Sequence, residues 1–292
     1  MSLCIPRTPY TGPVQAVVLD WAGTAVDYGC MGPADVFVKA FDAFGIAVTA
    51  AEARQFMGLE KKEHIRNMCK LPGVAGQWQE KHGRRPDATD VEQLYGKTEP
   101  MMVAAIADHA EPIFGLLPFV DAVRSRHIKI GSCTGYTAPM VKALAPAAAE
   151  RGYVPDAMVC SSDVPVGRPF PWMCYQNAIQ LQVHPFAAMI KIGDTISDIQ
   201  EGLNAGMWTI GLTRSGNELG LPEDQVNALD PDDLRDRLAT IETRFREAGA
   251  HYVVNGIWEC LAVVDEIGRR LGKGDHPLLK FISSSPQRVG KP

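Results

Sequence analysis

The chain has 292 residues, enough for about two domains or for one domain with a large insertion. Its 29 Lys and Arg against 34 Asp and Glu give a net charge of −5, which argues against a protein that binds nucleic acid or another polyanion. Hydrophobic residues make up 46% and charged residues 22%, a composition typical of a folded enzyme and not of a disordered chain.

The cysteine pattern and the N-terminus indicate where the protein works. Seven cysteines are an odd number without a Cys-x-x-Cys pair, which favours reduced thiols. Residues 1–13 hold no apolar run followed by a cleavage site, and no stretch approaches 18 apolar residues. We therefore expect a cytoplasmic protein without a secretory signal or a membrane partner.

The first expected element is a strand over 14–19 that ends at Asp20. Later apolar runs predict further strands over 128–133, 157–160, 189–192, 207–212 and 251–254. Helical segments separate these runs, and such alternation predicts an α/β fold with a doubly wound, mainly parallel sheet. Ligands of these folds bind at the carboxyl ends of the strands.

Residues 29–107 break this alternation and are expected to form an all-helical cap inserted into the core. An apolar stripe at helical spacing indicates a first helix that Gly45 ends: Val36, Phe37, Ala40, Phe41 and Phe44. Two capping boxes, Thr49 with Glu52 and Thr89 with Glu92, predict helix starts. Pro100 is expected to kink or split the second of these helices.

The domain organisation follows from these elements. We expect a discontinuous Rossmann-like core of residues 1–28 and 108–272, with 29–107 as the cap. A helix capped by Asp230 with Pro231 in its first turn, and a last helix over 258–271, complete the core. Residues 273–292 lack periodicity and are expected to be a mobile tail.

Polar residues follow three of the expected strands. Asp20 follows the first, Thr134 the second, and Asp194 and Asp198 the fourth, while Arg168 lies on a loop between them. Carboxylates at adjacent strand ends repel one another unless a cation lies between them. Mg²⁺ prefers such oxygen ligands, and Arg168 is suited to grip a tetrahedral anion in a bidentate manner.

In this order and spacing, the motifs resemble those of the haloacid dehalogenase-like superfamily over roughly residues 14–255. The resemblance implies Asp20 as the nucleophile that forms an aspartyl phosphate. It also implies Thr134, Arg168 and Gly23 as binders of the phosphonyl group. Mg²⁺ would be held by Asp20, Asp194 and the backbone oxygen of Ala22, and Asp198 would hold metal-bound water.

Ala22 departs from the phosphatases of this superfamily, which place a general acid two residues after the nucleophile. An alanine cannot protonate an oxygen leaving group. Either the leaving group needs no proton from this position, or the protein is not a phosphatase.

Three segments resemble the phosphonoacetaldehyde hydrolase family: 20–30, Met57-Gly58 with Lys61 and His64, and 167–175. The resemblance implies a phosphonoaldehyde substrate and a Schiff base on Lys61, with supporting roles for His64, Cys30, Tyr136 and Met57. An iminium at Lys61 turns the leaving carbanion into an enamine, which explains Ala22. Burial or a nearby positive charge should lower the Lys61 pKa.

The same resemblance implies a homodimer through the cap, and the bulky apolar stripe 36–44 agrees with that expectation. Two other functions stay open. A metal-free dehalogenase would also lack an acid at position 22, but it has no use for Lys61 or for an anion clamp at Arg168. A protein that binds phosphoryl ligands without catalysis would not need Lys61 either.

Overall fold

The computed structural model describes residues 9–278, and its centre is one sheet of six parallel strands. The strand order is β3-β2-β1-β4-β5-β6. The strands are β1 (Ala16–Leu19), β2 (Lys129–Thr134), β3 (Ala157–Cys160), β4 (Met189–Gly193), β5 (Trp208–Leu212) and β6 (Tyr252–Val254). Each of the six lies where the apolar runs predict it, and the doubly wound α/β fold is confirmed.

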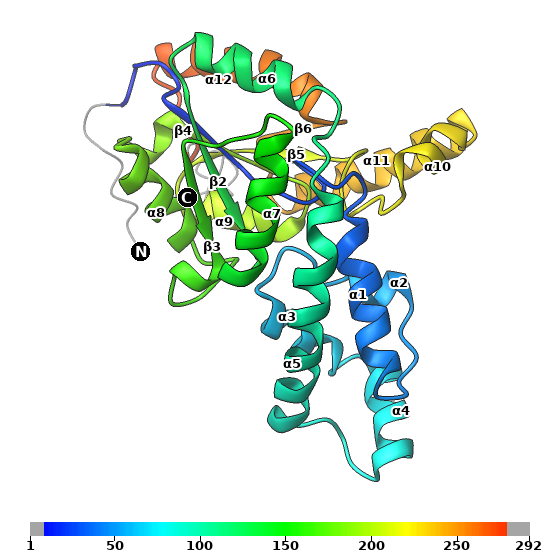
Figure 1. Ribbon diagram of the computed structural model, residues 1–292. Coiled ribbons are helices and arrows are strands. Elements are labelled where there is room, and N and C mark those ends of the chain that lie inside the picture. The colour runs from blue at the N-terminus through cyan, green and yellow to red at the C-terminus, as the bar shows by residue number, and fades with distance from the viewer. Residues whose placement is uncertain (1–8, 279–292) are drawn as a thin grey trace, which may run out of the picture.

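Helices cover both faces of this sheet, as Figure 1 shows. Val17 and Leu19 of β1 belong to the cluster that includes residues of α6 (Leu116–Ser125), α7 (Ala138–Glu150) and α12 (Cys260–Gly272). Ala16 and Val18 point to the opposite face, because successive side chains of a strand alternate. That face is covered by α8 (Trp172–Leu181), α9 (Ile196–Asn204) and α11 (Pro231–Glu247), and α10 (Glu223–Ala228) precedes α11.

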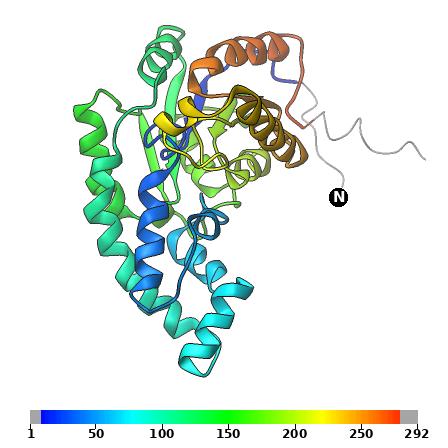
Figure 2. The same cartoon turned by 90° about the vertical axis from the view of Figure 1, so that its right-hand side faces the viewer.

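Between β1 and the second half of the core, the chain forms only helices. Figures 1 and 2 show them projecting together from one end of the sheet. They are α1 (Met31–Asp42), α2 (Ala50–Arg54), α3 (Lys61–Met68), α4 (Pro72–His82) and α5 (Ala88–Ala105). A short 3-10 turn, Ile106–His109, leads from α5 back to the core.

The apolar stripe of α1 is packed inside this helical layer. Val36, Phe37, Ala40 and Phe41 are all buried within the single chain. The Phe37 ring lies 4.0 Å from that of His64 on α3, and the Phe44 ring stacks on Trp78 of α4 at 6.0 Å. The stripe is therefore the core of the helical layer, and its size does not call for a second copy of the chain.

One of the two predicted helix starts is confirmed, and the other lies at different residues. Thr49 and Glu52 form the predicted capping box, but the box at the start of α5 uses Asp87 and Asp90, two residues earlier than expected. The Asp90 carboxylate also accepts a hydrogen bond from the Arg84 guanidinium. The split expected as one outcome at Pro100 is wrong, because α5 continues through that residue to Ala105.

The start of the expected tail is anchored. Asp275 accepts a hydrogen bond from Arg270 at 2.9 Å, and the Pro277 carbonyl lies 2.8 Å from Nε2 of His251. Residues 279–292, the rest of that expectation, lie outside the described residues. Among residues 9–278, no helix combines the length and apolar character needed to cross a membrane.

Candidate active site

Strand order brings three of the predicted site residues together. β1 lies between β2 and β4, so Asp20, Thr134 and Asp194 come from adjacent carboxyl ends. From β1 the chain adds β2 and β3 on one side and β4, β5 and β6 on the other, so the topological switch point lies at these carboxyl ends, where open α/β sheets bind their ligands. Oxygens of Asp20, Asp194 and Asp198 lie within 4.8 Å of one another, and all three side chains are buried.

Asp194 is held from two sides. Its Oδ1 accepts a hydrogen bond from the Thr24 hydroxyl at 2.9 Å, and its Oδ2 accepts one from the Asn217 backbone N–H at 2.8 Å. Burial, then the neighbouring charges of Asp20 and Asp198, raise the pKa of Asp194 well above its usual value. A cation at this position would reverse that shift.

Arg168 joins the acidic residues from the loop before α8. Its Nη2 donates to Asp20 at 2.7 Å and lies 3.1 Å from a carboxylate oxygen of Asp198, and its Nε donates to Glu201 at 2.8 Å. Lys191 of β4 donates to Asp198 at 2.5 Å. The structure thus adds Glu201 and Lys191, which the sequence analysis missed, to the predicted cluster.

The charges of this cluster do not balance. Four buried carboxylates, Asp20, Asp194, Asp198 and Glu201, face two buried cations, Arg168 and Lys191. Buried charges need partners, because burial without them costs several kcal/mol per ion. The oxygen donors and the excess of negative charge fit a divalent cation such as Mg²⁺.

Lys61 is the first residue of α3 and reaches the same cavity from the helical layer. Its side chain is buried, and Nζ lies 4.7 Å from the centre of the Tyr136 ring. Burial is the main cause of a lowered Lys61 pKa, and Arg168 adds to it, while Cys30 and Asp20 oppose it. A lowered pKa increases the fraction of neutral amine, the form that attacks a carbonyl.

The cavity between the two layers is nearly filled. It has a volume of about 20 Å³ and is lined by core residues that include Asp20, Thr134 and Arg168, and by Met57 and Lys61 of the helical layer. This space holds about one water molecule. A side chain on Gly135 would lie 2.5 Å from the Leu59 carbonyl oxygen, so glycine permits this close approach.

His64 lies one turn after Lys61 on α3 and is fully buried. Its Nε2 lies 2.7 Å from the Ala53 carbonyl oxygen, so this nitrogen carries the proton. Its Nδ1 has no hydrogen-bond partner among the described residues. Burial and the charge of Lys61 hold the His64 pKa well below its usual value, which leaves Nδ1 as a free acceptor.

Of the remaining expected residues, Cys30, Met57 and Tyr136 line the cavity, and so does Ala22. Burial and the carboxylates of Asp194 and Asp27 raise the pKa of Cys30 well above its usual value, so its thiol stays protonated. Gly23 packs closely against the acidic cluster. Its N–H donates to the carbonyls of Val26 and Asp27, and a Cβ there would lie 2.2 Å from Oδ2 of Asp194. This close approach favours glycine at position 23, and its role in phosphonyl binding stays a prediction.

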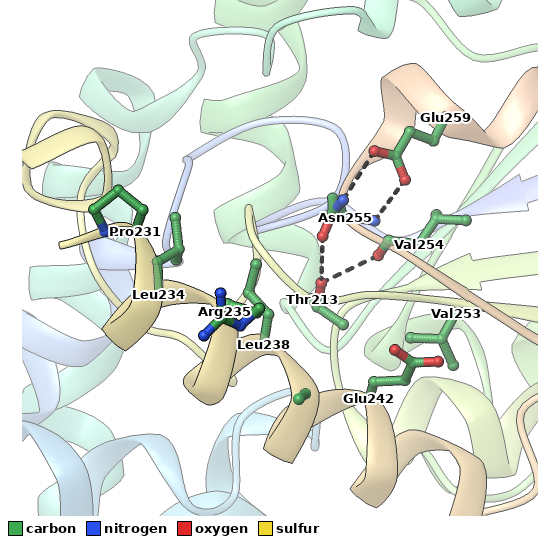
Figure 3. A pocket seen from close by; sticks show the side chains of 11 residues that line it. Thr213, Pro231, Leu234, Arg235, Leu238, Glu242, Val253, Val254, Asn255 and Glu259 are labelled. Atoms are coloured by element: carbon green, nitrogen blue, oxygen red, sulfur yellow. Dashed lines mark hydrogen bonds between the residues drawn. The ribbon is translucent and has the colours of Figure 1, made fainter. Parts of the chain in front are cut away.

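A second cavity, of about 440 Å³, lies between α11 and the ends of β5 and β6 (Figure 3). At its rim, Asn255 donates two hydrogen bonds to Glu259, each at 2.9 Å, and the Thr213 hydroxyl donates to the Val254 carbonyl. None of the expected site residues lines it. Its polar groups Thr213, Asn255 and Glu259 bond to one another, so it offers no comparable chemistry.

Comparison with known proteins agrees with this geometry. The sequence model of the haloacid dehalogenase-like hydrolases matches residues 14–206, so the chain belongs to that class of enzymes. It is 56% identical over 277 residues to a phosphonoacetaldehyde hydrolase of Syntrophobacter fumaroxidans, covering 95% of this chain and 100% of that protein. A phosphonoacetaldehyde hydrolase of Bacillus cereus is 45% identical over 257 residues, covering 88% and 97%.

A solved structure resembles the whole chain. The crystal structure of a phosphonoacetaldehyde hydrolase-like protein from Oleispira antarctica matches with a TM-score of 0.91 at 38% identity, covering 94% of this chain and 99% of that one. Within the haloacid dehalogenase-like hydrolases, the chain belongs to the phosphonoacetaldehyde hydrolase family.

Proposed function

We propose that the protein hydrolyses the carbon–phosphorus bond of phosphonoacetaldehyde to acetaldehyde and phosphate. One observation carries this proposal. The buried amine of Lys61 and the carboxylate of Asp20 line the same cavity, and Ala22 lies where related phosphatases carry an acid. A nucleophile for phosphorus and an amine for an aldehyde suit a substrate that holds both groups.

Lys61 prepares the bond for cleavage. Its neutral amine adds to the aldehyde carbon, and the resulting carbinolamine takes up one proton and loses water to leave an iminium ion. Asp20 then attacks phosphorus, and the electron pair of the carbon–phosphorus bond moves into the iminium to give an enamine. Protonation of the enamine at carbon and addition of water release acetaldehyde and restore Lys61. A second water hydrolyses the aspartyl phosphate, so one water is consumed per turnover.

The phosphonyl group needs cationic and hydrogen-bonding partners. Arg168 Nη2 already lies 2.7 Å from Asp20, so its guanidinium is positioned to hold oxygens of a group attached there. Thr134, also in the cavity lining, supplies a hydroxyl donor. Glu201 fixes Nε of Arg168 at 2.8 Å and keeps the guanidinium from rotating.

We propose Mg²⁺ as the cofactor, held by Asp20, Asp194 and the Ala22 backbone oxygen, with Asp198 next to it. When bound, the ion neutralises charge on the carboxylates and on the phosphonyl oxygens. Thr24 and Asn217 orient Asp194 for that task. Asp198 has a lowered pKa because Arg168 and Lys191 outweigh the effect of its burial, so it remains a carboxylate.

His64, Cys30, Tyr136 and Met57 support the Lys61 chemistry in this proposal. Nδ1 of His64, which has no hydrogen-bond partner among the described residues, is available to accept a hydrogen bond from the carbinolamine that forms at Lys61. The Tyr136 ring faces the Lys61 amine, and Met57 and Cys30 exclude water from it.

We also propose that residues 29–107 act as a cap that opens to admit substrate, over a core of 1–28 and 108–272. Support comes from the cavity, because about 20 Å³ is too small for a phosphonoaldehyde. The six cysteines among the described residues are free, which agrees with the cytoplasm as the site of action.

A homodimer through the cap is proposed on the family resemblance alone. The large exposed hydrophobic residues within 9–278, among them Phe114, Phe170 and Ile179, lie outside the cap, and the α1 stripe is buried except for the half-buried Phe44. Sedimentation velocity at micromolar concentration tests it. A species of twice the chain mass is expected, and a monomer alone would exclude the dimer.

The activity is tested by incubating the purified protein with phosphonoacetaldehyde and Mg²⁺ and measuring both products. Acetaldehyde and phosphate should appear in equal amounts. Phenyl phosphate and chloroacetate serve as controls for a phosphatase and a dehalogenase, and turnover of either should be at least ~10³-fold slower. Chloride release from chloroacetate without any phosphonate cleavage would overturn the proposal.

A further inference from the structure

Arg54, at the end of α2, bonds to two parts of the molecule that the proposed chemistry does not yet connect. We propose that Arg54 is a positioning residue that couples closure of the cap to the orientation of Asp194, through Asn217. This inference rests on the Mg²⁺ site of the proposed function.

The first contact is with the linker between the core and the cap. Nη1 of Arg54 donates to the backbone carbonyl of Gly29 at 2.7 Å and to that of Cys30 at 3.2 Å. Both carbonyls belong to the segment that leads into α1. The guanidinium therefore ties α2 to the point at which the chain leaves the core.

The second contact joins Arg54 to the loop after β5. Nη1 of Arg54 donates to Oδ1 of Asn217 at 3.3 Å, and Nδ2 of Asn217 donates back to the Arg54 carbonyl at 3.2 Å. Asn217 is only 5% exposed. Two reciprocal bonds fix the orientation of a buried amide better than one, because both ends of the amide then have a partner.

Asn217 carries the effect into the catalytic site. The backbone N–H of this residue donates to Oδ2 of Asp194 at 2.8 Å, and Thr24 holds Oδ1 from the other side. When the cap moves away, Arg54 leaves Asn217, and the loop is freed to shift its N–H from Asp194. A metal ligand whose supporting hydrogen bond is disturbed loses affinity for the metal.

Coupling of this kind acts in both directions. If closure of the cap improves the position of Asp194 for Mg²⁺, then bound Mg²⁺ must favour the closed cap by the same free energy. Arg54 would thus make the site bind the metal most tightly when the cap covers the substrate.

The test is calorimetric titration of the full chain with Mg²⁺ in the absence of substrate. Arg54→Ala and Asn217→Ala should each raise the Mg²⁺ dissociation constant about tenfold. The double variant should show no more than the larger single effect, because both changes break one connection. Arg54→Lys, which keeps a donor for the linker carbonyls, should recover part of the affinity.

Arg66→Ala is the matched control, since Arg66 is an exposed cap arginine that pairs with Glu63 on its own helix. It should bind Mg²⁺ as the wild type does. Wild-type affinity in both single variants, or additive losses in the double variant, would overturn the coupling while leaving the proposed function intact. Absence of Mg²⁺ binding in the wild-type protein would instead refute the metal site, and with it both proposals. Thermal unfolding of each variant shows whether it is folded.

Discussion

Lys61 differs from a surface lysine in its surroundings, and the difference predicts a pH profile. Its pKa is lowered chiefly by burial, with Arg168 contributing. Because only the neutral amine attacks the aldehyde, kcat/KM should rise with pH through the Lys61 pKa and then level off. The midpoint of the rise should lie below the ordinary lysine pKa of about 10.4. Rates measured across the pH range check this, and a midpoint at or above that value would contradict it.

Ala22 gives a second prediction for a single residue. Ala22→Asp would place another carboxylate in a cavity already lined by Asp20 and beside a cluster with excess negative charge. Turnover of phosphonoacetaldehyde should fall about tenfold or more, because the leaving enamine gains nothing from an acid there. Ala22→Ser, small and uncharged, is the control. A higher kcat/KM for Ala22→Asp would show that the assigned role of Ala22 is wrong.

The sequence pattern indicated the residues at strand ends but not their supports. Asp20, Thr134 and Asp194 follow apolar runs, so their convergence could be predicted from topology. The sequence pattern gives weaker evidence that Lys191 and Glu201 belong to the site. A lysine inside an otherwise apolar strand needs a buried partner, and Glu201 lies three residues after Asp198 on α9. Which partner each finds depends on how α9 packs on β4, which the sequence alone does not specify.

At the scale of elements, helix boundaries were predicted better than helix continuity. The strands and the Thr49 and Asp230 caps lie where the residue pattern places them. Helix α5 runs through Pro100, which is exposed. Because proline has no N–H, the backbone carbonyl of Gly96 lacks its helical hydrogen bond, but Gly96 is exposed as well. Water can reach that carbonyl. Helix propensity predicts the free-energy cost of a proline inside a helix, but it does not predict the tertiary packing that offsets this cost.

Replacing this proline should stabilise the protein. Pro100→Ala restores an N–H donor for the Gly96 carbonyl and removes a ring clash within α5, while it also makes the unfolded chain more flexible. The free energy of unfolding should rise by about 1 kcal/mol, seen as a higher urea midpoint. Gly96→Ala serves for comparison, since it stabilises the same turn by helix propensity alone. A lower midpoint for Pro100→Ala would mean that Pro100 makes a contact in the fold that the helix argument omits.

For the molecule as a whole, the sequence predicted a helical segment and a parallel sheet but not how tightly they meet. Three contacts bring the α2–α3 segment close to the core. Gly135 has no side chain that would clash with Leu59, and Arg168 donates to the Gly58 carbonyl at 3.2 Å. Arg54 donates to the side chain of Asn217. These contacts join segments more than 75 residues apart. Neither residue periodicity nor local motifs report such contacts.

Metal removal tests the assembled site. In the proposed site, a bound cation offsets the buried negative charge of Asp20 and Asp194, so EDTA should abolish phosphonate cleavage and Mg²⁺ should restore it. Mg²⁺ should also raise the unfolding temperature in proportion to the logarithm of its concentration above its dissociation constant. Ca²⁺ is a useful comparison, because it takes longer bonds and a looser geometry. Full activity in a chelated, metal-stripped sample would remove the metal from this account.

The central claim is that a lysine of the helical cap and an aspartate of the core act on one substrate. Borohydride trapping followed by peptide mass spectrometry tests it most directly. Borohydride should inactivate the protein only when phosphonoacetaldehyde is present, with the label on buried Lys61 and not on the adjacent Lys62, which pairs with Glu92. Lys61→Arg should fold, remain unlabelled and lose carbon–phosphorus cleavage by about three orders of magnitude or more, because a guanidinium stays protonated. Labelling of Lys62 alone, with Lys61→Arg still turning over, would contradict the account.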